Sequence, residues 1–249
     1  MLDKLKRFLP ASLRPKMYLV RLVRRETKCR VQHGPFAGLD LGPDCSWLPA
    51  LLGTYEKELW PVVSEIVEIA PDTIVNIGAA EGYYAVGFAR LLPGTKVLAF
   101  EMDEHVRATL AQVVDRNGVN KAIEIRGKCD VPALARALQN APRSLVICDV
   151  EGYESVLLDP AKVPELRGAY ILVEVHDFIV AGVSQQLRDR FAGSHDMREI
   201  GQLPRAASDF PYMTSFLRLL PSAYRKWAVR ERWDDNTVWF FMSPKSAAA

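Results

Sequence analysis

The sequence contains few cysteines and no long apolar run. Four cysteines (Cys29, Cys45, Cys129 and Cys148) are scattered over 249 residues, with no C-x-x-C pair and no His/Cys spacing typical of zinc sites. A disulfide framework or a zinc site is therefore not expected. We expect a reducing, cytoplasmic location instead. Because no run of about 18 apolar residues is present, no transmembrane helix is predicted. The N-terminus also lacks the apolar core of a secretory signal.

Positive charge is concentrated near the N-terminus. Residues 1–30 hold ten Lys and Arg against Asp3 and Glu26, a local balance of +8, whereas the whole chain carries only +2. The stretch MYLVRLVRRETKCR mixes apolar and basic residues at helical spacing, which is typical of a solvated helix covering a domain. The alternative is a surface for an anionic membrane, a nucleic acid or an acidic partner. The residues alone leave both interpretations open.

Short apolar runs alternate with amphipathic segments from about residue 55 onward. The first of these segments, GTYEKELWPVVSEIVEIA, is predicted to be one helix. The strands predicted after it are TIVNI, KVLAFE, AIEIRG, RSLVICDV and AYILVEVHD, followed by DMREIGQL and NTVWFFMS. Helices between short apolar strands indicate a parallel sheet covered on both faces. We therefore predict an α/β fold with a doubly wound, mostly parallel, seven-stranded Rossmann-like sheet.

Two segments lie outside this alternation. Residues 1–54 are predicted to be a basic extension, with helix over 1–28 and two short strands in CRVQHGPFAGLDLG. Segment 203–235 is rich in aromatic and basic residues, and it is either a lid over a ligand cleft or a surface excursion that packs for stability. Tyr55 and Glu56 either fold over the ligand or are ordinary residues at a helix start.

The turn in IVNIGAAEGYY follows the first strand of the predicted sheet, where doubly wound folds bind ligands. Gly78 and Gly82 are four positions apart, which does not match the G-x-G-x-x-G pattern of dinucleotide loops. Glu101 ends the second strand, nineteen positions after Gly82. A carboxylate there can accept hydrogen bonds from both hydroxyls of a ribose. The spacing disfavours NAD and favours a smaller ligand with one ribose.

Four motifs in this order resemble the class I S-adenosylmethionine (SAM)-dependent methyltransferases, and most of all the FkbM-type group: VNIGAAEGYYAVGFA, VLAFEMD, LVICDVEGYESVLL and ILVEVHDF. That group has a turn similar to D-x-G-A-N-x-G-Y and a fourth strand ending in D-x-E-G-x-E. The resemblance covers residues 55–180 well and makes 55–249 a methyltransferase domain. Two positions differ, because Asn76 replaces the usual acid and Ala80 an Asn.

The resemblance implies SAM as cofactor and S-adenosylhomocysteine (SAH) as product. It places Glu101 at the ribose, residues 127–130 near the adenine, and Asp149 near the SAM amino group or the substrate. Neutral Asn76 can form hydrogen bonds to the ammonium group but cannot pair with its charge. The implied cofactor-binding residues are Asn76, Gly78, Ala80, Glu81, Gly82, Tyr83, Glu101, Met102, Gly127, Lys128, Cys129 and Asp149.

Candidate catalytic residues follow the fourth and fifth strands. Asp149 ends the fourth, and the fifth carries Glu174 and His176 on one face, because they are two positions apart. Transfer to a hydroxyl needs a base, and His176 is the first candidate because its unperturbed pKa is near 7. The three side chains could instead hold a divalent metal ion that orients a diol. Alternatively, His176 is a histidine hydrogen-bonded in packing, and Glu174 is a partner of a nearby Arg or of the backbone.

The expected function is O-methylation of a small-molecule, sugar or lipid-linked acceptor by a SAM-dependent methyltransferase. DVEGYE replaces the [N/D]-P-P-aromatic turn of many enzymes that methylate base amines, which disfavours that chemistry. One alternative is an NAD-type oxidoreductase on the same sheet plan. Another is a non-catalytic module that binds nucleic acid or membrane through residues 1–30. Neither the acceptor nor the oligomeric state follows from the sequence.

Overall fold

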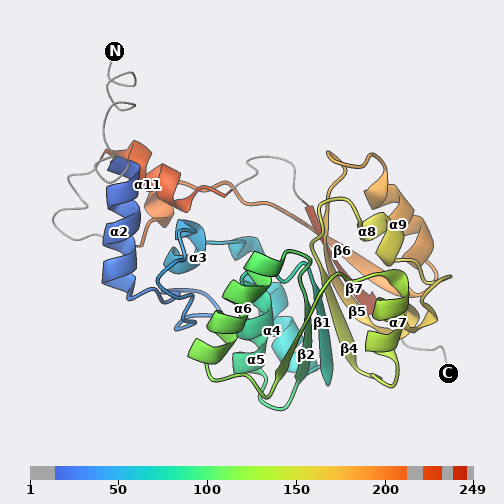
Figure 1. The fold of residues 1–249 in the computed structure, drawn as a ribbon. Helices are drawn as coiled ribbons and strands as arrows, with labels where there is room; N and C mark the ends of the chain where they lie inside the picture. The colour runs from blue at the N-terminus through green and yellow to red at the C-terminus, as the bar shows by residue number, and fades with distance from the viewer. Residues whose placement is uncertain (1–14, 212–220, 232–237, 246–249) are drawn as a thin grey trace. The chain divides into compact units, whose positions relative to one another are not determined.

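The computed structural model describes residues 15–211, 221–231 and 238–245, and a seven-stranded sheet is its central element (Figure 1). The strand order is β3-β2-β1-β4-β5-β7-β6. The first five strands are parallel, whereas β7 is antiparallel to both β5 and β6. The strands are β1 Thr73–Ile77, β2 Lys96–Phe100, β3 Ile123–Arg126, β4 Ser144–Cys148, β5 Tyr170–Val175, β6 His195–Gly201 and β7 Val238–Pro244. The predicted sheet is confirmed.

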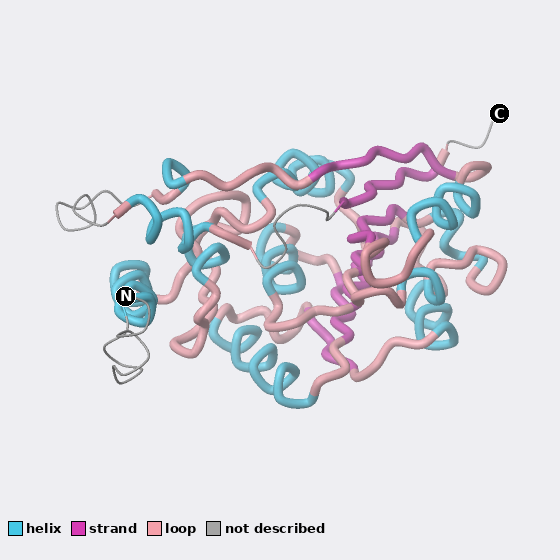
Figure 2. The backbone as a smooth tube through the Cα atoms, turned by 90° about the horizontal axis from the view of Figure 1, so that it is seen from above, coloured by secondary structure: helices cyan, strands magenta, loops and turns pink. Residues whose placement is uncertain are grey.

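Helices cover both faces of the sheet (Figures 1 and 2). One face carries α4 Trp60–Ile69, α5 Tyr83–Leu91 and α6 Glu104–Arg116, and the other carries α7 Val131–Leu138, α8 Glu154–Leu157 and α9 Val183–Phe191. A 3₁₀ turn, η3 Pro164–Gly168, follows α8. The single helix predicted over GTYEKELWPVVSEIVEIA is too long, because a 3₁₀ turn (η2 Lys57–Leu59) precedes α4. Pro61 lies in the first turn of α4, where its missing N–H costs no helical hydrogen bond.

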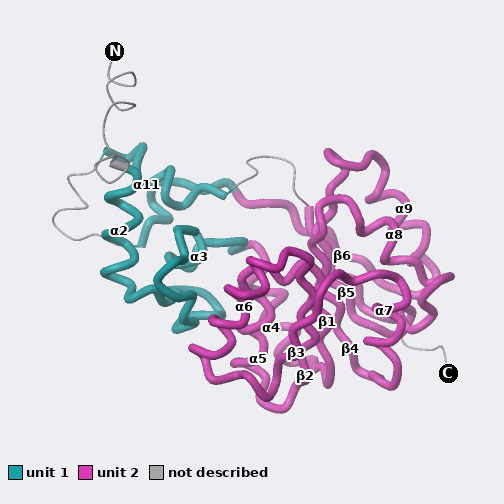
Figure 3. Tube along the Cα trace, viewed as in Figure 1, with its two compact units in different colours: residues 1–57, 204–234 teal, residues 58–203, 235–249 magenta. Residues whose placement is uncertain are grey.

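The chain divides into two compact units, which Figure 3 colours separately. Residues 58–203 and 235–249 form the unit that contains the sheet, and residues 1–57 and 204–234 form the other. The predicted helix over 1–28 is present as α2 Pro15–Thr27, and its first fourteen residues lie outside the described residues. No helix among the described residues is long and apolar enough to cross a membrane.

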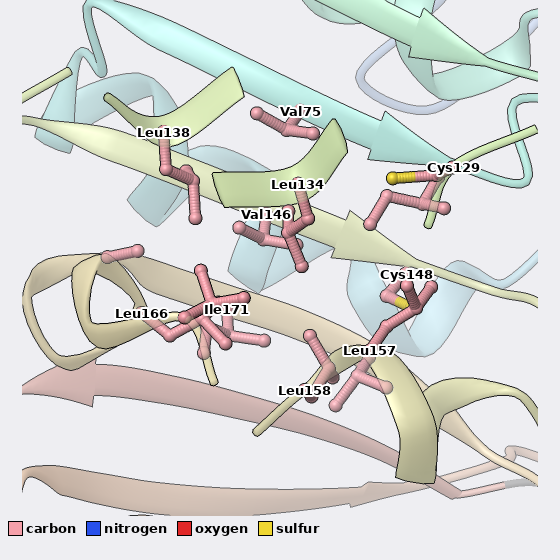
Figure 4. Packing of buried hydrophobic residues seen from close by; sticks show 14 of the residues in the cluster. Val75, Cys129, Leu134, Leu138, Val146, Cys148, Leu157, Leu158, Leu166 and Ile171 are labelled. Carbon is pink, nitrogen blue, oxygen red and sulfur yellow. The ribbon is translucent and has the colours of Figure 1, made fainter. Parts of the chain in front are cut away.

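A hydrophobic core of the sheet unit lies under α7, α8 and α9 (Figure 4). Val75, Val146 and Ile171 point from neighbouring strands toward Leu134 and Leu138 of α7, and all five are at most 2% exposed. The burial of these apolar side chains is the main force that holds the strands in register. Two cysteines lie in the same core, Cys129 and Cys148.

The smaller unit contains α2, α3 Leu48–Leu52, η4 Ala207–Asp209 and α11 Ser222–Val229. The two strands predicted in CRVQHGPFAGLDLG are wrong, because residues 29–42 form only one isolated bridge, between Arg30 and Asp40. The chain reverses there at Gly34, Gly38 and Gly42, which all have positive φ, so no extended segment is long enough to form a strand.

Of segment 203–235, the described residues 204–211 and 221–231 belong to the smaller unit. Arg205 forms a buried ion pair with Glu231 and donates a hydrogen bond to the Thr54 carbonyl. Lys57 pairs with Asp209 at 2.7 Å. Residues 212–220 and 232–235 lie outside the described residues, and a lid over the ligand cleft stays a prediction.

Candidate active site

The register of the parallel strands brings three predicted site residues to one edge of the sheet. Ile77, the last residue of β1, pairs with Phe100 of β2 and with Cys148 of β4. The three strands therefore end at the same level, and the residues that follow them are Gly78, Glu101 and Asp149. The strand order reverses between β1 and β4, and this is the switch point where doubly wound sheets bind ligands.

The turn at residues 78–82 approaches the end of β4 closely. Gly78 has a φ of 78°, and a Cβ there would lie 1.8 Å from the backbone oxygen of Asp149. Ala80 also has a positive φ, of 45°, which is uncommon for a residue with a side chain. Gly82 packs against Leu110 of α6, so that a Cβ would lie 2.5 Å from a methyl carbon. The turn is therefore tightly held from both sides.

Glu101 connects this turn to the loop after β2. Its Oε2 accepts a hydrogen bond from the Ala80 N–H at 3.0 Å, and its Oε1 accepts one from the Asp103 N–H at 2.8 Å. A carboxylate offers about four lone-pair positions. Positions therefore remain for a ligand diol. Arg107 donates to the carbonyls of Glu101 and Met102, and the Met102 side chain is 71% exposed beside this loop.

Asn76 carries an unsatisfied acceptor below the turn. Its side chain is 2% exposed, and its Oδ1 is buried with no hydrogen-bond partner among the described residues. Leaving such an oxygen unpaired costs about 1–3 kcal/mol. A donor such as an ammonium group or a water molecule would satisfy it. The Asn76 oxygen, the close turn and the Glu101 carboxylate therefore fit a ligand with an ammonium group and one ribose.

The remaining predicted cofactor residues differ in exposure. Glu81 is exposed, and the Tyr83 ring meets the Tyr84 ring edge to face, with centroids 5.4 Å apart. Gly127 and Lys128 are exposed, and the Lys128 ammonium lies 5.4 Å from the Tyr153 ring centre. Cys129 is buried in the core, and burial together with Asp130 raises the pKa of its thiol to about 12. The Cys129 thiol is therefore buried and protonated rather than reactive.

Asp149, Glu174 and His176 form one cluster at the ends of β4 and β5. Cys148 pairs with Val173, so Asp149 and Glu174 follow at the same level of adjacent strands. The His176 Nε2 lies 3.6 Å from Asp149 Oδ1 and 3.4 Å from Glu174 Oε2. One ligand-type atom from each side chain lies within 4.8 Å of the others, a spacing that suits either direct contacts or a divalent ion.

Glu154 is a site residue that the predictions did not include. Its side chain is fully buried, and its Oε1 lies 2.6 Å from the His176 Nδ1. It is the last residue of DVEGYE, the run whose first residue is Asp149. The DVEGYE run was therefore the sequence signal that could have identified Glu154. Its contact with His176, however, depends on the pairing of β4 with β5.

The carboxylates change the acid–base properties of His176. Burial alone lowers the pKa of this imidazole, but hydrogen bonds and charges from Glu154 and Glu174 outweigh it and raise the pKa to about 10. The expectation of an unperturbed pKa near 7 is therefore wrong. Burial and the neighbouring Glu174 also raise the pKa of Asp149 well above its ordinary value. His176 therefore stays largely protonated at neutral pH.

Tyr55 and Glu56 belong to the smaller unit. The Tyr55 ring meets Trp47 edge to face, with centroids 5.3 Å apart. Glu56 is buried, and its N–H donates to the Glu231 carboxylate at 3.1 Å. Both residues therefore have packing or hydrogen-bonding roles within that unit.

The chain is similar in structure to several solved proteins, among them methyltransferases. The cofactor-bound protein Rv0187 from MTB gives a TM-score of 0.52 at 11% identity, covering 97% of this chain and 95% of that one. A proposed O-methyltransferase from Klebsiella pneumoniae gives a TM-score of 0.51 at 13% identity, covering 97% of this chain and 94% of that one. An O-methyltransferase from Bacillus cereus in complex with SAH gives a TM-score of 0.49 at 13% identity, covering 98% of this chain and 100% of that one.

The sequence itself matches no protein-family model and no curated protein. At 11–13% identity, the first two structural likenesses concern the arrangement of the elements rather than a shared activity. They agree with the sheet order and with the helices on both faces. The chain therefore has the Rossmann-like fold seen in class I methyltransferases.

Proposed function

We propose that the chain is a SAM-dependent methyltransferase that acts on an oxygen atom of a small-molecule, sugar or lipid-linked acceptor. The observation that carries the proposal is the common level of Gly78, Glu101 and Asp149 at the switch point. The resemblance of the four sequence motifs to FkbM-type enzymes and the likeness to an O-methyltransferase fold support the same function. SAM, when bound, supplies an electrophilic methyl group on its sulfonium sulfur.

On the cofactor side, each residue has a role that follows from its surroundings. Glu101 would accept hydrogen bonds from the ribose hydroxyls, while its bonds to the Ala80 and Asp103 N–H groups hold it in place. The unsatisfied Asn76 oxygen would accept a hydrogen bond from the ammonium group. Gly78 would keep the turn free of a side chain that would collide with β4.

On the acceptor side, the cluster of Asp149, Glu174 and His176 would align a hydroxyl and take up its proton. Alignment contributes much of the rate in a displacement of this kind. Because the pKa of His176 is about 10, only its minor neutral form can act as base at pH 7. The rate should therefore rise with pH toward 10. We favour direct contacts over a metal ion, since His176 Nε2 already lies beside both carboxylates.

Cofactor binding is tested by calorimetry with SAM, SAH and NAD on the full chain. We expect SAM and SAH to bind and NAD not to bind. Glu101→Ala should weaken SAH binding about tenfold or more, because hydrogen bonds to charged groups contribute about 1.5–3 kcal/mol. Glu124→Ala is a matched control, since Glu124 is a half-exposed carboxylate on β3. Unchanged affinity in Glu101→Ala would refute this cofactor site, and binding of NAD alone would favour an oxidoreductase.

Turnover is tested with labelled SAM and a panel of phenols, sugars and lipid-linked saccharides. His176→Gln should lower the rate about 10²–10⁴-fold, the usual contribution of a general base, while SAH affinity stays unchanged. Full activity of His176→Gln would rule out this base. A chain that binds SAH, methylates no acceptor, and binds nucleic acid or anionic vesicles with a steep salt dependence would favour the non-catalytic alternative.

A further inference from the structure

The Glu154 side chain is completely buried beside His176. One carboxylate oxygen of Glu154, Oε1, meets three hydrogen-bond donors. These are the His176 Nδ1 at 2.6 Å, the Gly152 N–H at 3.2 Å and the Val150 N–H at 3.3 Å. The other oxygen, Oε2, is buried with no hydrogen-bond partner among the described residues.

The charge of Glu154 needs a partner, because an isolated buried carboxylate is strongly unfavourable. Among the described residues, His176 is its one ion-pair partner. An ionised carboxylate only accepts hydrogen bonds, so the hydrogen on this contact belongs to the His176 Nδ1. The His176 side chain is itself 1% exposed, so both members of the ion pair are buried from solvent.

The local backbone is built around this contact. Residues 150–153 form a turn over the Glu154 carboxylate, with Gly152 at a φ of 103°. A Cβ at Gly152 would lie 2.8 Å from a Val180 methyl carbon, so a side chain there would push the turn away from the loop after β5. The turn after β4 and the loop after β5 therefore hold Glu154 and His176 together from the ends of two neighbouring strands.

We propose that Glu154 is a positioning residue, which holds His176 by its Nδ1–H so that Nε2 faces the acidic side chains at the sheet edge. The first and last residues of DVEGYE then lie beside different ring nitrogens of His176. Glu154 contacts Nδ1, and Asp149 lies 3.6 Å from Nε2. The charged groups facing His176 are Asp149 from β4, Glu154 from α8 and Glu174 from β5. From the loop after β5, the apolar Phe178 ring lies with its centroid 5.6 Å from that of the His176 ring.

A role of Glu154 in turnover rests on the proposed methyltransferase function. The contact between Glu154 and His176 does not depend on that function. The primary test is therefore an NMR measurement of the full chain labelled with ¹⁵N at histidine, with EDTA present and without cofactor. Comparison with His176→Gln assigns the His176 signals among the four histidines. Above the imidazole pKa, we expect the neutral ring to keep its proton on Nδ1. A neutral ring with its proton on Nε2 would overturn the proposal, and this readout needs no Glu154 variant.

The second test uses Glu154→Gln, which keeps an oxygen for the three donors and removes the charge. The His176 pKa should fall by at least about one unit, because a neighbouring opposite charge within about 4–6 Å shifts a pKa by about 1–3 units. Glu151→Gln is the matched control, since Glu151 belongs to the same run and is exposed. An unchanged His176 titration in folded Glu154→Gln would refute the role of the charge.

Turnover separates this proposal from the proposed function. If wild type methylates an acceptor, the rising limb of its pH–rate profile should move to lower pH in Glu154→Gln, with SAH affinity unchanged. A limb that does not move would overturn the positioning role. If wild type shows the Nδ1–H tautomer but neither binds SAM nor turns over any acceptor, the methyltransferase function fails and the Glu154–His176 pair stands.

Discussion

Replacing Gly78 with alanine should destabilise the chain more than the same substitution at the other glycines in turns of the sheet unit, because an added Cβ would meet the closest contact there. The added Cβ would lie 1.8 Å from the Asp149 carbonyl oxygen, far inside contact distance. That oxygen belongs to the backbone at the end of β4, so no side-chain rotation can relieve the overlap. Either the turn or the strand end must move, and both form the proposed cofactor site.

The magnitude follows from two separate contributions. A positive φ costs a residue with a Cβ about 1–2 kcal/mol, and forced overpacking adds about 1–3 kcal/mol. Gly118→Ala is the matched control, because Gly118 has a φ of 66° but no atom within 4 Å of an added Cβ. We therefore expect a loss of about 3 kcal/mol at Gly78 and about 1 kcal/mol at Gly118.

Thermal unfolding followed by circular dichroism would measure the difference. For a chain of this length, each 1 kcal/mol lowers the midpoint by about 2–4 °C. Gly78→Ala should therefore unfold about 6–12 °C below wild type and Gly118→Ala about 2–4 °C below it. SAH affinity should fall only in Gly78→Ala. Equal midpoints for the two variants would show that β1 and β4 do not approach as described, and the reasoning would fail.

Three further predictions concern pH, metal ions and thiols. Because folding raises the pKa of His176 from 6.5 to about 10, its contribution to stability is complete below about pH 6.5 and is lost toward pH 10. Urea unfolding of wild type should therefore weaken over this range more than that of His176→Gln, and parallel curves would contradict the shift. EDTA should leave methyl transfer unchanged, and a loss restored by Mg²⁺ would instead indicate a metal site. A thiol reagent should modify the partly exposed Cys29 and Cys45 quickly and the buried Cys129 and Cys148 only after unfolding, whereas rapid reaction of all four would contradict their burial.

Much of the sheet could be predicted because each strand carries its own signal. TIVNI and RSLVICDV are short apolar runs bounded by turn residues, and both form strands close to the predicted limits. Local signals failed where the backbone conformation decided the outcome. In residues 29–42, the sequence resembled a hairpin, but three glycines at positive φ turn the chain before a strand can form.

The sequence by itself determined the order of strands and helices, the glycine turn and the acid that follows the second strand, because these depend on neighbouring residues. Only the tertiary structure decided what surrounds His176. Glu154 is 22 positions away in the chain, and it reaches the ring only because β4 and β5 pair side by side. A pKa depends on charges and burial in space rather than along the chain. The same packing that joins these strands therefore changes His176 from a residue titrating near 7 to one titrating at about 10.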